Sequence, residues 1–343
     1  MELLQSIVGH VSYPSRIEYD YPNITYPIPF DQLYNNKSMR YVDFGKPNSR
    51  LPSFVQLGEV TESSFRDVDY IVVTGSSSNH LYSNINTIYS ILLADIRVSI
   101  VFVDFGLEDE PFAVLVREMK IMQEIYQQRG SWGQLYYRKF DFSHFPDWFD
   151  ISDRMIRGGY SWKVISYADV LMESRRMVFW SDGGNQVPAS LETELSRART
   201  YGLFTPCSGG SLQMWLHGQS IRFLGWNKML RKLFLGKAMC TGGYLFIHYN
   251  NTQVMQNVLI PLLQCAYTRR CISPLGSSRR NHRQDQAILS ALVQSEKIPM
   301  SCQQKYNTGV RFHHECDSDE KCRSRREELI QKLRGGYVYD RGD

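Results

Sequence analysis

Between residues 69 and 184 the sequence alternates short apolar runs with stretches of helical periodicity. The apolar runs begin at Tyr70, Val98, Leu135 and Met177, and helical patterns cover 81–95, 111–128 and the segment after Tyr160. Four strands alternating with three helices predict βαβ units and a parallel sheet. Right-handed crossovers place the carboxyl ends of such strands on one edge. We therefore expect an α/β fold with polar strand-end residues along that edge. These residues are Thr74, Asp104, Asp141 or Ser143, and Asp182.

The last apolar run, Met177 to Trp180, leads directly into Ser181-Asp182-Gly183-Gly184. Open α/β sheets bind ligands at the carboxyl ends of their strands, and a carboxylate there can take part in the chemistry. The two glycines allow a sharp turn and a close approach of the backbone to a ligand. Asp182 is therefore the first site residue that we predict. A turn-forming Asp-Gly pair without a ligand is the alternative.

We expect three regions along the chain. Residues 1–65 are rich in Tyr, Pro, Asn and Ser and show little periodicity, which indicates an irregular N-terminal lead-in. Residues 66–300 form the α/β domain, with a further strand at 243–248 and helices at 252–267 and 284–295. Residues 301–343 form a charged C-terminal extension with a solvated helix at 316–334.

Composition excludes some functions. The chain has 39 Lys and Arg against 35 Asp and Glu, a net charge of +4, which is too small to indicate nucleic acid or an anionic membrane surface as a partner. No run of 18 apolar residues occurs, so we expect no transmembrane segment. The first residues lack both a basic start and a long apolar stretch, so the sequence predicts no signal peptide.

The cysteines and the glycosylation sequons point to a lumenal or extracellular compartment. Cys265 and Cys271 are separated by five residues, as are Cys316 and Cys322. These gaps do not suit zinc, so we predict local disulfides, with unpaired buried thiols as the alternative. Asn-x-Ser/Thr triplets occur at three places, which are Asn23, Asn36 and Asn250. The Golgi or ER lumen, or secretion, is the predicted location, in conflict with the missing targeting signal.

Two strand ends have residues that suit a nucleotide. The first predicted strand runs into Thr74-Gly75-Ser76-Ser77-Ser78-Asn79-His80, whose hydroxyls and N–H groups at a helix start suit a phosphate. N-capping serines on an ordinary helix are the alternative. Asp104 ends the second strand in VDFGL, where it could accept hydrogen bonds from a ribose or cap the following turn.

Further charged groups lie in three other segments. Lys163 in YSWK could reach a phosphate from its helix, whereas Tyr160 and Trp162 beside it are expected in the core. In RRNHRQDQ, Arg283 could face a diphosphate and Asp285 could act as a general base or hold a sugar hydroxyl, or the segment could be a solvated basic loop with a helix cap. One of the adjacent His313 and His314 could add a ligand to a metal site, although a surface pair is the simpler interpretation.

With these residues in view, the chain resembles the domain of unknown function DUF1647, a group similar to nucleotide-diphospho-sugar transferases of the GT-A fold. The resemblance spans roughly residues 69–296. Its motifs are, in order, VVTGSSSNH, VDFGL, YRKFDFSHFP, YSWK, VFWSDGG, CAYTRRCISPLGS and NHRQDQ.

The resemblance implies a Rossmann-like GT-A sheet that binds a nucleotide-sugar donor, often with Mn²⁺ or Mg²⁺, and a glycan or glycoprotein acceptor. Asp182 would be the second Asp of an Asp-x-Asp metal motif, but the first position is Trp180. Asp285 would be a catalytic or acceptor-side carboxylate, and His313 or His314 could complete the metal site. The expected donor pocket contains Thr74, Ser76, Asn79, Asp104, Lys163 and Arg283.

Three functions follow as hypotheses. The first is a glycosyltransferase in which Asp182 binds the cation or the donor ribose, Lys163 or Arg283 neutralises the leaving diphosphate, and Asp285 orients or deprotonates the acceptor. The second is a catalytically inactive relative that binds a glycan or a protein, because the partner carboxylate is missing. The third, an NAD(P)-dependent oxidoreductase, rests only on TGSSS and lacks the later glycines of that motif.

Overall fold

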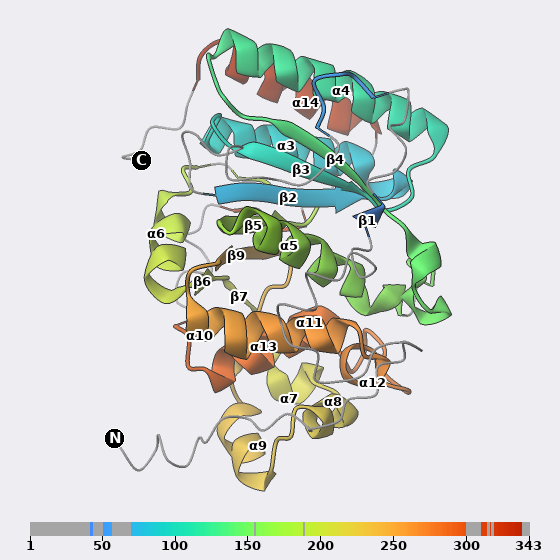
Figure 1. Ribbon diagram of the computed structural model, residues 1–343, viewed down its shortest axis with the longest axis vertical. Helices are drawn as coiled ribbons and strands as arrows, with labels where there is room; N and C mark the ends of the chain where they lie inside the picture. Colours follow the sequence, from blue (N-terminus) through green and yellow to red (C-terminus); the bar gives the residue numbers. More distant parts are fainter. Residues whose placement is uncertain are drawn as a thin grey trace.

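The computed structural model of the chain describes residues 42–43, 51–56, 70–153, 156–187, 189–299, 310–313, 316 and 319–337. A seven-stranded sheet forms its centre, in the order β1-β4-β3-β2-β5-β9-β6 (Figure 1). Strands β2, β3, β4 and β5 run parallel to one another, whereas β1 is antiparallel to β4, and β9 is antiparallel to both β5 and β6. The strands are β1 (Val42–Asp43), β2 (Tyr70–Ser76), β3 (Ser99–Asp104), β4 (Leu135–Phe140), β5 (Met177–Ser181), β6 (Leu203–Phe204) and β9 (Tyr244–His248).

Successive side chains of the central strands feed two separate apolar cores. Ile71 and Val73 of β2 point into one core and Tyr70 and Val72 into the other, as the two-residue period of a strand requires. Helices cover both faces, with α3 (Leu81–Ala94), α4 (Asp109–Gln128) and α14 (Asp319–Arg334) on one side (Figure 1). On the other side lie α5 (Ser161–Ser174), α11 (Ile260–Ala266) and α13 (Gln284–Ser295). The predicted fold class, a mostly parallel Rossmann-like sheet flanked by helices, is confirmed.

The chain order of the parallel strands creates a switch point between β2 and β5. From β2 the chain moves outward to β3 and β4, then returns through α5 to place β5 on the other side of β2. Such a reversal leaves a crevice at the carboxyl ends of the two strands that flank it, which is where open α/β sheets bind ligands. The two flanking loops are those that contain Ser76–His80 and Asp182–Asn185.

The second half of the chain adds smaller elements around α13. The predicted strand at 243–248 is β9, and the predicted helices at 252–267 and 284–295 are confirmed, the first as two α-helical pieces joined by a π-helical turn. A second, two-stranded sheet pairs β7 (Cys207–Ser211) with β8 (Ala238–Cys240). The remaining α-helices of the described residues are α6 (Glu192–Tyr201), α7 (Leu212–Trp215), α8 (Gly218–Phe223), α9 (Lys228–Phe234), α10 (Thr252–Val254) and α12 (Arg269–Ile272).

Both predicted local disulfides are present, Cys265–Cys271 and Cys316–Cys322. Cys207 is also disulfide-bonded, whereas Cys240 is a buried free thiol. The predicted solvated helix is α14, and one face of it is buried instead. The Asn86 amide donates to the Cys322 carbonyl at 3.1 Å, and Leu333 joins the core of α3 and α4, because this face carries the apolar side chains of an otherwise charged helix.

Some predicted features lie outside the described residues. These are the sequons at Asn23 and Asn36, His314 and most of the lead-in. Of that lead-in, β1 pairs with β4 and Gln56 forms a bridge with Tyr136 at the same edge of the sheet. Asn250 of the third sequon is exposed in a turn after β9. No helix among the described residues is long and apolar enough to cross a membrane.

Candidate functional site

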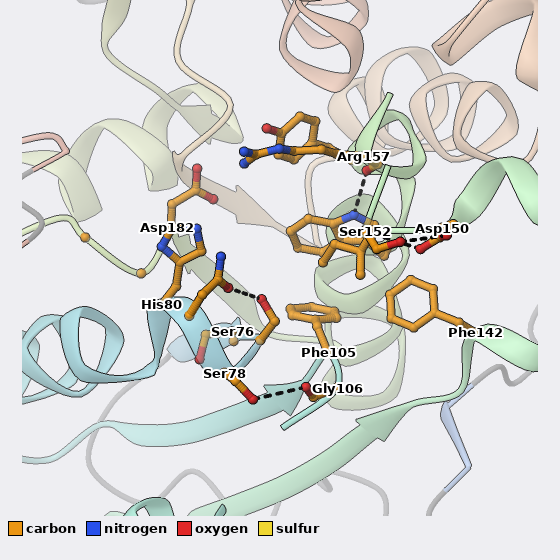
Figure 2. Close-up of a pocket in the computed structure, with 18 of the residues that line it drawn as sticks. Ser76, Ser78, His80, Phe105, Gly106, Phe142, Asp150, Ser152, Arg157 and Asp182 are labelled. Carbon is orange, nitrogen blue, oxygen red and sulfur yellow. Dashed lines mark hydrogen bonds between the residues drawn. The ribbon is translucent and has the colours of Figure 1, made fainter. Parts of the chain in front are cut away.

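A cavity of about 700 Å³ opens at the switch point. This volume is within the range that small-ligand sites occupy. Its walls come from the loops after β2, β3 and β5, from residues in the ranges 142–152 and 157–162, and from Arg279 and His313. In Figure 2, Asp182 and His80 lie on one side of the cavity and Phe142 and Asp150 on the other, with Phe105 between them. The cavity thus combines aromatic walls with convergent polar groups.

Asp182 is part of a cluster of three charged side chains. The Lys163 Nζ lies 3.3 Å from Oδ1 of Asp182 and 3.0 Å from Oδ2 of Asp285. Lys163 and Asp285 are buried, whereas the Asp182 side chain is 36% exposed and faces the cavity. Residues from α5, from the end of β5 and from the first turn of α13 therefore meet around one ammonium group. Lys163 also lies over the ring of Tyr160, 5.1 Å from its centroid.

Charge pairing decides the protonation of this cluster. Burial acts to lower the pKa of Lys163, but the adjacent Asp182 and Asp285 carboxylates outweigh it and raise that pKa above its ordinary value. Burial raises the pKa of the Asp285 carboxyl, while Lys163 acts to lower it. Lys163 is therefore a fixed positive charge at neutral pH, held by two carboxylates.

Trp180 holds the exposed carboxylate from the strand side. Its indole Nε1 donates to Oδ1 of Asp182 at 2.7 Å. The residue that departs from the expected Asp-x-Asp pattern thus acts on the remaining aspartate. The backbone N–H of Asp182 donates to the Gly243 carbonyl at 2.9 Å, so both ends of the residue are fixed.

Two consecutive glycines make room for the carboxylates. A Cβ atom on Gly243 would lie 2.5 Å from Oδ2 of Asp182, and one on Gly242 would lie 2.9 Å from Oδ2 of Asp285. Real Cβ atoms do not approach a carboxylate oxygen closer than about 3 Å, since atoms at that separation already overlap. The turn between β8 and β9 therefore needs glycine at both positions for the cluster to form.

The described donor set does not fit the divalent cation that the resemblance implies. Among the described residues no group of three or more His, Cys, Asp or Glu side chains converges on a point. The two carboxylates that do converge share the Lys163 ammonium, whose charge would repel a cation bound at the same oxygens. His313 is exposed and lines the same cavities, but it forms no such group with Asp182.

The segment from Arg157 to Tyr160 contributes to the cavity wall, although the sequence predicted Tyr160 in the core. Tyr160 is instead half-buried and lines both cavities. All four residues have left-handed backbone conformations, with φ of 50°, 60°, 60° and 56°. For Arg157 and Tyr160 this costs about 1 kcal/mol each, and such strain persists only where surrounding contacts enforce it. Here the Trp162 Nε1 donates to the Arg157 carbonyl at 3.1 Å. The Gly158-Gly159 pair was the available signal, since glycine adopts this conformation freely.

Two residues predicted to line the pocket, Thr74 and Asp104, do not line the cavity, because their side chains form hydrogen bonds within the protein. The Thr74 hydroxyl is fully buried, donates to the Ser181 carbonyl at 2.8 Å and accepts from the Asn84 amide at 2.7 Å. It joins the ends of β2 and β5. Asp104 accepts from the backbone N–H groups of Gly106 and Leu107, at 2.7 and 2.6 Å, and from the Tyr137 hydroxyl. Of the two roles considered for Asp104, these contacts are those of a turn cap.

Most of the other predicted residues line one of the two cavities. Ser76 and Asn79 line the main one, and the Ser76 Oγ is buried without a hydrogen-bond partner among the described residues. Arg283 lines a smaller adjoining cavity of about 90 Å³, together with Lys163, Asp182, Asp285 and Arg279. Its guanidinium stacks on the Trp215 ring at 4.4 Å. Asp141 accepts from Ser143 in its own turn and does not line the main cavity, whereas Phe142 between them does.

Comparison with known proteins gives similar structures but no similar sequence. No protein-family model matches the chain, so membership of DUF1647 stays a prediction, and comparison with curated proteins gives no match. The structure is similar to that of the mannosyltransferase Ktr4p from S. cerevisiae in complex with GDP, at 8% identity and a TM-score of 0.43, over 98% of this chain and 99% of that one.

Two further structures are similar over most of this chain. One is core-mannan synthase A from Aspergillus fumigatus in its Mn/GDP form, at 10% identity and a TM-score of 0.44, over 76% of this chain and 78% of that one. The other is apo WbbM, a bifunctional glycosyltransferase, at 14% identity and a TM-score of 0.41. That match covers 76% of this chain but only 45% of WbbM. At these values the similarity does not extend to activity, donor or acceptor.

Proposed function

We propose that the protein is a glycosyltransferase that moves a sugar from a nucleotide-sugar donor to a hydroxyl group of a glycan or protein. The observation that carries this proposal is the Asp182–Lys163–Asp285 cluster, which adjoins a cavity of about 700 Å³ at the switch point between β2 and β5. A nucleotide bound at such a switch point contacts the loop after the first strand. Ser76 and Asn79 in that loop would bind the nucleotide, and Phe105 would form an apolar wall for it.

In the reaction, the bond from the sugar C1 to the diphosphate oxygen breaks and a bond from C1 to the acceptor oxygen forms. The electron pair leaves with the diphosphate, so negative charge develops there. Arg157 and Arg279 line the cavity and would stabilise this charge, with Lys163 behind Asp182. A fixed cation in a partly water-excluded site stabilises such charge without reorganising.

The acceptor hydroxyl must lose its proton as the new bond forms. Asp285 lines the smaller cavity next to Asp182, where its carboxylate would accept the hydrogen bond of an acceptor hydroxyl. Asp182, the more exposed carboxylate, would face the donor sugar or ribose. Positioning and general-base assistance together account for large rate factors in such transfers.

Binding of the donor tests the proposal first. Purified protein is screened by thermal shift against UDP-, GDP- and dTDP-sugars, which all carry a diphosphate leaving group, in metal-free buffer and with Mn²⁺. Binding at a hundred times Kd stabilises the native state by about 2.7 kcal/mol, which shifts the midpoint by several degrees. Asp182→Ala should abolish the shift and Gly209→Ala, on an open edge of β7, should retain it. Wild-type protein that neither binds nor turns over any of these donors would refute the proposal.

A second candidate function is a catalytically inactive relative that binds a glycan or a partner protein. It is favoured by one observation, namely that both carboxylates of the cluster are already paired with Lys163. Glycan binding without donor, unchanged by Asp182→Ala, together with no turnover, would select this candidate. In either case we propose a lumenal or secreted protein, which the disulfides Cys265–Cys271 and Cys316–Cys322 favour.

A further inference from the structure

Charge is distributed unevenly along the chain. Between Glu194 and Asp285 there is no acidic residue, whereas the same stretch contains twelve lysines and arginines. The net charge of the whole chain is only +4, so the remaining residues carry a net negative charge that offsets the positive charge of this stretch. The whole-chain charge is therefore a poor guide to the surface that this stretch forms, since electrostatic attraction depends on local charge within about a Debye length.

Helix α9 presents part of this excess to solvent beside exposed apolar side chains. The Asn227 side chain caps the helix by accepting from the Leu230 N–H at 2.9 Å. Phe234 is buried and packs on Trp226, which fixes the inner face. The outward residues form two adjacent i, i+4 pairs. They are Lys228 with Lys232 and Met229 with Leu233, and the two apolar side chains are 48% and 42% exposed.

The elements around α9 also expose basic and apolar side chains. The Lys237 carbonyl accepts from the Leu212 N–H, which joins the end of α9 to α7, and α9 lies at the far end of the molecule from α4 (Figure 1). Further exposed basic and apolar side chains lie on α7, α8, α12 and the loops that follow α9 and α12. They are Met214, Arg222, Lys237, Arg270 and Leu275.

We propose that α9 and its flanking basic residues bind the surface of an anionic lipid bilayer. Lysines that attract acidic head groups beside apolar side chains that enter the head-group boundary are the two features of an interfacial helix. A soluble polyanion would neutralise Lys228 and Lys232 but leave Met229 and Leu233 in water. The apolar pair therefore favours a bilayer over an acidic polysaccharide or a nucleic acid.

This surface is separate from the candidate site. None of the α9 residues lines either of the two cavities described above. No ion pair within the described part of the chain involves Lys228 or Lys232, so both charges are open to a partner. Changes on α9 can therefore alter surface binding without altering the donor site.

Vesicle co-sedimentation of the full chain tests the proposal. Wild-type protein should sediment with phosphatidylcholine vesicles that contain phosphatidylserine, less at high salt, and remain in the supernatant with phosphatidylcholine alone. Lys228→Glu with Lys232→Glu should weaken this binding by at least about tenfold, since each basic residue near an anionic surface contributes severalfold. Met229→Ser with Leu233→Ser should weaken it as well.

The control for charge is Arg117→Glu with Lys120→Glu, two exposed residues on α4 that should leave binding unchanged. Thermal melts show that each variant is folded. Three outcomes would overturn the proposal. They are equal binding to neutral vesicles, loss of binding in the α4 control, and heparin binding that depends on the α9 lysines but not on Met229 and Leu233, without vesicle binding.

Discussion

The indole N–H of Trp180 donates to Oδ1 of Asp182 at 2.7 Å, across one intervening residue of the same strand end. Trp180 stands where a second metal-binding carboxylate is expected, and it instead orients the carboxylate that remains.

Trp180→Phe keeps most of the apolar volume but removes this hydrogen bond. We expect a loss of about 1 to 3 kcal/mol in the free energy of unfolding and roughly tenfold weaker donor binding. Denaturant unfolding and donor titration measure the two effects. Unchanged donor affinity in a folded Trp180→Phe protein would show that the bond does not position Asp182.

Gly243→Ala tests whether the turn before β9 shapes the charge cluster. Its Cβ would meet Oδ2 of Asp182 at 2.5 Å, so the carboxylate must move away from Lys163. We expect a loss of donor binding and about 2 kcal/mol lower stability, measured by titration and by urea unfolding. Gly209→Ala is the matched control, because nothing lies within 4 Å of the added atom there. If both variants bind donor equally well, the approach of Gly243 to Asp182 is not a requirement of the site.

Because the His282 ring is buried, we expect the free energy of unfolding to decrease in acid. Its ring is buried, with Nε2 3.1 Å from the Ile272 carbonyl and Nδ1 3.1 Å from the Trp215 carbonyl, and burial lowers its pKa to about 4. The folded protein therefore resists protonation of a residue that takes up a proton near pH 6.5 when unfolded. Stability should be complete above pH 6.5 and should fall, by about 3 kcal/mol in total, as the pH drops through 4.

Unfolding free energies between pH 7 and 4 measure this effect, and the slope should be smaller in His282→Gln by about the amount that one titrating group contributes. Glu194 has the opposite effect on stability over much of the same pH range. Burial raises its pKa to about 7, so its contribution is present below pH 4.5 and is lost as the pH rises through 7. Both proteins contain Glu194, so the difference between wild type and His282→Gln gives the contribution of the histidine alone. Identical slopes in the two proteins would contradict the assignment.

Donor binding should not require a divalent cation. Lys163 already places a positive charge between Asp182 and Asp285, and no third ligating side chain converges on them among the described residues. Calorimetric titration of the donor found in the thermal-shift screen should give Kd values within about twofold in EDTA and in Mn²⁺, because a metal that bridged the diphosphate would change affinity far more. A tenfold or greater gain in Mn²⁺ would contradict the account of Lys163.

The periodicity of apolar residues predicts the strands of the sheet well. It does not predict which residues far apart in the sequence come into contact. The runs from Tyr70 and Met177 are buried strands because both faces of a parallel sheet are covered, which leaves a continuous apolar signal. By contrast, Lys163 and Asp285 meet only because α5 and α13 pack on the same face. No local sequence pattern indicates how these two helices pack, so the contact between Lys163, Asp182 and Asp285 could not be predicted from the sequence.

The strand ends show why polar residues alone do not define a pocket. Thr74 and Asp104 follow buried strands as predicted, yet their side chains are engaged by Ser181, Asn84 and neighbouring backbone N–H groups. A polar side chain at a strand end must satisfy its hydrogen bonds in either role, and its sequence position is the same in both.

The central claim is that Asp182, Lys163 and Asp285 form a sugar-transfer site. Its most direct test is turnover of the bound nucleotide sugar, as transfer or slow hydrolysis, by wild type and by Asp285→Asn. The amide keeps the side-chain shape but cannot take the acceptor proton, so the rate should fall by about a hundredfold or more while donor Kd stays within threefold. Turnover that is unchanged in Asp285→Asn, or a wild-type protein that binds the donor and never releases its sugar, would contradict the account.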